Sequence, residues 1–167
     1  MNKIYQLIDR ITPKNYWLQL LTLTFYTLFL SISFNLILLE VIGLQIEFPK
    51  DGIIKKIQKN IYLFFSVFVI LVPLIETAIF QWLPTLLYNY FKTTKKKEVL
   101  FCAITGIIFG LTHSYTLGYQ IAMSFTGIIL ISLTMYYSEK ERNYFLPIFF
   151  IHLTNNFLVF LVHHFKK

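Results

Sequence analysis

This sequence of 167 residues has few charged residues and a single cysteine. Charged side chains make up 14% of the chain, whereas a soluble domain has about 25%. Because Cys102 is the only cysteine, an internal disulfide is excluded, and its place in an apolar run indicates a small packing residue. The composition therefore argues against both a soluble domain and a disulfide-stabilised fold.

Apolar residues are abundant where charge is scarce. They account for 56% of the chain, and the mean hydropathy is +0.62. A helix of about 20 apolar residues crosses a bilayer, and apolar runs lie at about 17–39, 61–91, 99–115, 119–137 and 144–164. We predict one integral membrane domain over 1–167, an all-α polytopic transmembrane helical bundle of about five spans. Pro73 and Pro84 predict a kink or a break in the second run.

The first residues of the chain have a different pattern. Leu7, Ile8 and Ile11 recur at helical spacing between polar residues, which predicts that 1–15 forms an amphipathic helix on the membrane surface. The first apolar run begins near Tyr16, is long enough to span, and is not followed by an A-x-A site. A cleavable signal peptide is therefore not expected.

Basic residues outnumber acidic ones, with 15 Lys and Arg against 8 Asp and Glu, for a net charge of +7. They lie in short segments between the apolar runs and form no stripe with interleaved aromatic residues, so we predict a lipid bilayer and no nucleic acid as partner. The side of the N-terminus, 92–98 and 138–143 carries nine basic residues, and the side of 45–60 and the C-terminus carries six. The positive-inside rule then places the N-terminus in the cytoplasm. Scarce Ala beside abundant Ile, Phe and Lys indicates a bacterial inner membrane.

Three polar fragments interrupt the apolar runs, at 76–81, 109–113 and 152–156. A carboxylate and imidazoles at lipid depth are costly unless they face one another or a wet cavity. The third run also contains Gly106 and Gly110, a pair of small residues that allows a neighbouring helix to approach closely. His113, the last residue of the second fragment, falls on that same face, so it is predicted to point toward a partner helix.

The depths of the polar groups suggest one shared site. At about 1.5 Å of rise per residue, Glu76, His113 and Asn156 lie about 23, 22 and 20 Å from the side that carries Lys92. His152 lies one turn before Asn156 and shares its helix face. We predict that three helices bring these four side chains together in a polar intramembrane cavity.

This set of residues is suited to hydrolysis without a serine or cysteine nucleophile. Glu76 beside His113 can hold and deprotonate a water, and His152 with Asn156 can donate hydrogen bonds to an oxyanion. No cofactor is required by that mechanism. The alternative is a zinc ion held by Glu76, His113 and His152, although the local signature H-E-x-x-H is absent.

Structural roles are the competing interpretation for the same residues. Glu76 can cap a helix broken by proline, His113 can lie at the interface, and His152 with Asn156 can join helices by hydrogen bonds. Packing or interfacial positions are expected for a further group of residues: Tyr115, Tyr119, Tyr136, Tyr137, His163 and His164.

The motifs resemble those of the CAAX protease and bacteriocin-processing family, also called CPBP or Abi, of intramembrane endopeptidases. Its motifs are written EExxxR, FxxxH and HxxxN. The second is present from Phe109 to His113 and the third from His152 to Asn156, in order and within apolar helices. The resemblance covers about 61–160.

The resemblance implies a helical bundle around a conical cavity that is open to lipid. It implies that Glu76, assisted by His113, activates water, while His152 and Asn156 stabilise the oxyanion. The expected function is cleavage of a peptide or a membrane-protein substrate. The family is described both as metalloproteases and as metal-free glutamate-dependent enzymes.

The first motif departs from the family pattern. Thr77 stands in place of the second glutamate, and Gln81 stands in place of the arginine. Reduced catalysis is one consequence to expect. The alternative hypothesis is a non-catalytic bacteriocin-immunity or regulatory protein that binds peptide in the same cavity, together with a membrane partner protein. A transporter is disfavoured by the few helices and the lack of an inverted repeat.

Overall fold

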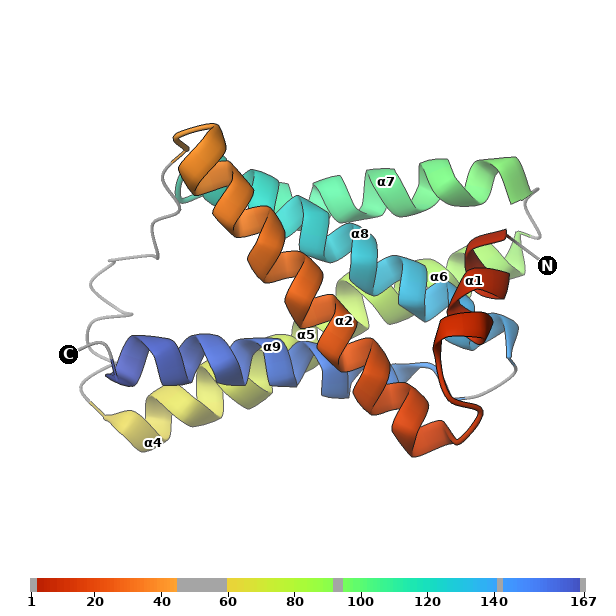
Figure 1. The fold of residues 1–167 in the computed structure, drawn as a ribbon, viewed down its shortest axis with the longest axis horizontal. Coiled ribbons are helices and arrows are strands. Elements are labelled where there is room, and N and C mark those ends of the chain that lie inside the picture. The colour runs from red at the N-terminus through yellow and green to blue at the C-terminus, as the bar shows by residue number, and fades with distance from the viewer. Residues whose placement is uncertain (1–2, 45–59, 92–94, 141–142, 166–167) are drawn as a thin grey trace.

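The computed structural model describes four ranges of the chain (Figure 1): 3–44, 60–91, 95–140 and 143–165. Every regular element in these ranges is a helix, which confirms the all-α fold class. Most of the expected connecting segment 45–60 lies outside the described residues, as do parts of the charged loops at 92–97 and 138–143. The side chains of His163 and His164 also lie outside them.

Four of the described helical runs are long and apolar enough to cross a membrane. They are α2 (Tyr16–Leu36) with its π-helical continuation η1 (Ile37–Val41), the run from Ile61 to Tyr90, α8 (Leu117–Glu139), and α9 (Phe145–Phe165). The expected third span corresponds to α7 (Lys95–Leu111), which has 17 residues and contains three lysines and a glutamate in its first turn. The described part of the chain thus has four long spans and one shorter helix where about five spans were predicted.

The run from Ile61 to Tyr90 is helical throughout, so the predicted break at the prolines does not occur. It consists of α4 (Ile61–Phe64), η2 (Phe65–Leu71), α5 (Val72–Glu76), η3 (Thr77–Trp82) and α6 (Leu83–Tyr90). Pro73 and Pro84 each stand in the first two positions of an α-helical piece, directly after the π-helical segments η2 and η3. Proline has no N–H to donate, and the shifted hydrogen-bond register of a π-helical segment accommodates that loss without a break.

Helices α7 and α8 lie side by side along much of their length (Figure 1). Their contact is made close by glycine, as the sequence predicted. A Cβ atom on Gly106 would lie 2.5 Å from the backbone N of Ile128, and one on Gly110 would lie 2.5 Å from the carbonyl O of Gln120. No side chain fits in these positions, so the two backbones are in direct contact. This contact holds the end of α7, and His113 after it, at a fixed position beside α8.

The N-terminal helix α1 (Lys3–Ile11) docks on one end of the bundle. Tyr5 is buried and donates a hydrogen bond to Glu98 at the beginning of α7. The Asp9 carboxylate lies 2.7 Å from the Lys140 ammonium at the end of α8 and accepts a 2.6 Å hydrogen bond from Tyr136. The N-terminal helix, the start of α7 and the end of α8 therefore meet at one end of the molecule, the grouping on which the predicted orientation was based.

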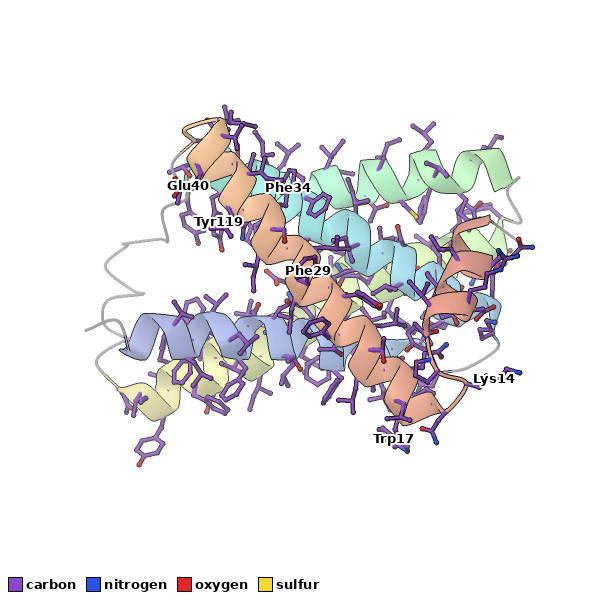
Figure 2. All side chains as sticks on the ribbon, in the orientation of Figure 1. Lys14, Trp17, Phe29, Phe34, Glu40 and Tyr119 are labelled. Atoms are coloured by element: carbon purple, nitrogen blue, oxygen red, sulfur yellow. The ribbon has the colours of Figure 1, made fainter. Side chains whose placement is uncertain are left out.

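Helix α2 crosses α8 and α9 diagonally (Figure 1) and packs on both. Its outer side is apolar and exposed: Trp17, Phe25 and Phe29 are 68%, 65% and 57% exposed. Figure 2 shows Lys14 and Trp17 at one end of this helix and Glu40 near the other. Lipid is the solvent that suits such a surface, and a Lys–Trp pair is typical of the membrane interface. The inner side of α2 faces the interior of the bundle, where it lines a cavity.

Candidate functional site

The carboxylate of Glu76 lies between two imidazoles. Its Oε1 is 3.3 Å from Nε2 of His113, and its Oε2 is 3.3 Å from Nε2 of His152. The side chains of Glu76 and His113 are 19% and 15% exposed, whereas that of His152 is 4% exposed. The long run, the end of α7 and α9 thus bring three of the four predicted residues together, with the carboxylate and His113 accessible from the cavity.

The orientation of His113 is set by the first residue of its own motif. Nδ1 of His113 lies 2.8 Å from the carbonyl O of Phe109. A carbonyl oxygen can only accept, so the proton is assigned to Nδ1, and Nε2 is directed at Glu76. The Phe109 ring is 1% exposed and contacts both imidazoles, with centroid distances of 4.7 Å to His113 and 6.0 Å to His152. Phe109 therefore positions both histidines.

His152 is held from the opposite side by Thr77. The Thr77 hydroxyl is 3.2 Å from Nδ1 of His152, and Thr77 is fully buried. Since Nε2 faces the Glu76 carboxylate, the proton is assigned to Nε2, and the hydroxyl donates to Nδ1. His152 is then the Nε2–H tautomer and can donate from Nε2, whereas Nε2 of His113 and Glu76 hydrogen-bond through a proton that lies between them, on the imidazole or on the carboxyl.

Asn156 is anchored to the long run. Its Nδ2 donates a 3.0 Å hydrogen bond to the carbonyl O of Phe68, within the π-helical segment η2. A carboxamide has two N–H groups, so one remains for a ligand. The neighbouring Asn155 donates to its own helix, at 3.2 Å from the carbonyl O of Ile151. The fourth predicted residue thus belongs to the same site, held by its own contact to the backbone.

All four predicted residues line one cavity of about 550 Å³. Apolar side chains such as Phe68, Val72 and Phe80 form one wall, and α2 contributes the opposite wall with Leu28, Ser31, Ile32 and Asn35. Tyr115 and Tyr119, from the turn between α7 and α8 and the beginning of α8, also line it. The predicted polar intramembrane cavity is confirmed, and it combines one polar cluster with largely apolar walls.

Sequence reasoning missed several members of this site. Thr77 was noted only as a departure from the family motif, yet it contacts His152 directly. Tyr119 was expected as a packing or interfacial residue, yet its ring lies 5.8 Å from that of His113. The wall from α2 had a signal in the sequence, because Ser31 and Asn35 are one helical turn apart and share a face.

Gln81 replaces the arginine of the family motif and is also buried. It is 1% exposed, and neither its Oε1 nor its Nε2 has a hydrogen-bond partner among the described residues. Thr77 and Gln81 are four residues apart, so they lie on one helix face. This face carries two neutral side chains where the family motif has two opposite charges.

The Glu76 carboxylate contacts both imidazoles directly, one through each oxygen. Among the residues that the structure describes, no three His, Cys, Asp or Glu side chains are arranged to hold a metal ion. The metal-free mechanism and the zinc ion held by Glu76, His113 and His152 both stay predictions.

Comparison with protein families matches residues 58–158, more than half of the chain, to the family described as type II CAAX prenyl endopeptidase Rce1-like. The matched segment includes Glu76, His113, His152 and Asn156, whereas α1 and α2 lie outside it. No curated protein and no solved structure matches the chain.

Proposed function

The chain belongs to the type II CAAX prenyl endopeptidase Rce1-like family, and from this membership we propose that it is an intramembrane endopeptidase whose Glu76 activates water. The observation that carries the proposal is the position of Glu76, 3.3 Å from each of two imidazoles that face the same cavity. Its substrate is a peptide or a membrane-protein segment, and its location is the inner membrane of a bacterial cell with the N-terminus in the cytoplasm.

The first step is removal of a proton from water. The Glu76 carboxylate takes this proton while the water oxygen forms a bond to the carbonyl carbon of the scissile peptide. His113 is ready to share that proton, because its Nδ1 is committed to the carbonyl of Phe109 and its Nε2 faces Glu76. The pair thus acts as the general base, and a low-dielectric cavity strengthens the interaction between its members.

The second step is stabilisation of the oxyanion and expulsion of the amine. The Nε2–H of His152 and the free N–H of Asn156 donate to the negative oxygen of the tetrahedral intermediate. The C–N bond then breaks, and the proton held by Glu76 and His113 passes to the departing nitrogen. The Thr77 hydroxyl supports this step, because it keeps the proton of His152 on Nε2.

The test is cleavage of a fluorogenic peptide in proteoliposomes, with a prenylated CAAX peptide and its unprenylated counterpart as probes. Glu76→Ala and His113→Ala should each lower kcat about 100-fold or more, the usual contribution of a general base. Glu40→Ala is the matched control, since it removes an exposed carboxylate in η1, the continuation of α2, and Glu40 is not among the residues that line the cavity. Full activity in both site variants would refute the catalytic roles.

A second candidate is a peptide-binding protein without catalysis, of the bacteriocin-immunity or regulatory kind. The observation that favours it is the neutral pair Thr77 and Gln81, buried where the family motif has charges. Glu76→Gln keeps the shape of the site and removes the base. If this variant retains the cellular phenotype while a bulky cavity substitution such as Val72→Phe abolishes it, binding is the function.

A further inference from the structure

The carboxamide of Asn35 lies in the wall of the cavity and bonds no residue that the structure describes. Asn35 belongs to α2, is half-buried, and lines the same cavity as Glu76. Its amide bonds to nothing among the described residues. A polar side chain within a membrane-spanning helix typically faces a wet cavity or a binding site, so this amide is available to a group that arrives in the cavity and pairs with it.

Other polar side chains that line the cavity outside the four site residues have hydrogen-bond partners. The Ser31 hydroxyl lies 3.4 Å from that of Thr126, and Asn155 donates to the carbonyl of Ile151. Leu28 and Ile32, which flank Asn35 on the inner side of α2, are apolar. Of the two polar side chains in the α2 wall, Ser31 is engaged, and Asn35 is the one that bonds no described residue; it lies on a different helix from each of the four site residues.

The matched segment of the chain does not include this wall. Residues 58–158 supply Glu76, His113, His152 and Asn156, while Asn35 comes from a helix that precedes them. The chemistry and the opposite wall thus come from different parts of the sequence. A residue on that wall can select what enters without taking part in the reaction.

We propose that Asn35 is a substrate-positioning residue, whose carboxamide hydrogen-bonds the main chain of the peptide that lies against Glu76. The inference rests on the proposed function and adds a recognition element to it. A carboxamide offers one acceptor and two donors, which match the N–H and C=O of a peptide unit. Such a unit loses its hydrogen bonds to water when it enters an apolar cavity, and Asn35 replaces them.

The experiment measures kcat and KM for the prenylated and unprenylated fluorogenic peptides in proteoliposomes of phosphatidylethanolamine and phosphatidylglycerol. Asn35→Leu should raise KM about tenfold and leave kcat within about threefold, since hydrogen bonds that act in binding alone have this effect. Thr22→Val on the same helix is the matched control, because the Thr22 hydroxyl bonds only to its own helix, at Leu18 O. Asn35→Ala removes the carboxamide without adding bulk. An effect that both variants share is therefore not caused by disturbed packing.

Binding of the same peptides is measured separately, by fluorescence anisotropy in the Glu76→Gln background. Asn35→Leu should weaken binding about tenfold there as well. An unchanged KM and unchanged binding, or a loss of kcat alone, would overturn the role of Asn35 while the proposed function stands. If Asn35→Leu weakens binding but the wild-type chain cleaves neither peptide, the proposed function is overturned and the role of Asn35 in binding stands. A wild-type chain that neither binds nor cleaves them would overturn both.

Discussion

Replacing Thr77 by valine removes one hydroxyl from the site and keeps the shape of the side chain. Thr85 offers the same replacement two turns farther along the same helical run. Both threonines are fully buried. They differ in one respect: the Thr77 hydroxyl is 3.2 Å from Nδ1 of His152, whereas the Thr85 hydroxyl has no hydrogen-bond partner among the described residues.

The expected effects therefore have opposite signs. Thr77→Val removes a buried hydrogen bond and leaves Nδ1 of a histidine that is 3% exposed without a partner, which should lower the free energy of unfolding by about 1–3 kcal/mol. Thr85→Val replaces an unpaired buried hydroxyl with a methyl group, so it should raise the free energy of unfolding by about 1 kcal/mol. Packing is unchanged in both cases because threonine and valine have nearly the same volume.

The assay is reversible unfolding in mixed micelles by titration with sodium dodecyl sulfate, followed by circular dichroism. Cleavage of the fluorogenic peptide should fall in Thr77→Val, because His152 is then free to adopt the other tautomer, and should persist in Thr85→Val. Thr77→Ser restores the hydroxyl and should recover activity. Equal shifts for the two valines, or a serine variant as impaired as the valine, would refute the assigned hydrogen bond.

Two further predictions concern the parts of the bundle that hold the site. Gly110→Ala places a Cβ atom 2.5 Å from the carbonyl O of Gln120 and should destabilise by at least about 2 kcal/mol through overpacking, measured by the same unfolding titration. Gly43→Ala is the comparison, because a Cβ atom at Gly43 would meet no atom of the described residues beyond its chain neighbours within 4 Å. Its free energy of unfolding should fall by only about 1 kcal/mol, the cost of a positive φ of 72°. Partial burial of Asp9 acts to raise the pKa of that carboxyl, but hydrogen bonds from Lys140 and Tyr136 and the charge of Lys140 hold the pKa below its ordinary value. A lowered folded-state pKa stabilises the docked α1 above about pH 4, and this contribution should be lost as the pH falls through the folded-state value. Thermal unfolding from pH 6 to pH 3 should show this loss in the wild type and not in Asp9→Asn; an identical acid response in both would contradict it.

The similar depth of Glu76, His113 and Asn156 was predictable because helix geometry converts sequence position into depth. The rise per residue and the number of residues from the charged loops placed these three side chains at one level and His152 one turn away. Close packing of α7 on a neighbouring helix was predictable for a similar reason, since Gly106 and Gly110 recur at the spacing of one helix face; the structure identifies that neighbour as α8. Periodicity within a single helix carries this kind of information.

The contacts that hold each side chain were not predictable in the same way. The bond between Thr77 and His152 joins residues 75 positions apart, and nothing in either helix alone specifies the rotation that brings them together. The continuity of the helix through Pro73 and Pro84 depends on the two π-helical segments, which have no sequence signature. Asn35 lay in a run recognised only as a span, and its role depends on which face of α2 meets the cavity.

The docking of α1 also has a consequence for the order of assembly. Asp9 pairs with Lys140, 131 residues later in the chain, so this contact forms only after the ribosome has completed α8. Its contact with Glu98 at the start of α7 also joins residues 93 positions apart. Until α7 is made, α1 lacks both contacts, and its amphipathic character keeps it at the membrane surface. Its docking beside Glu98 and Lys140 is therefore a late step of biogenesis, in which α1 closes one end of a bundle made of helices that are synthesised after it.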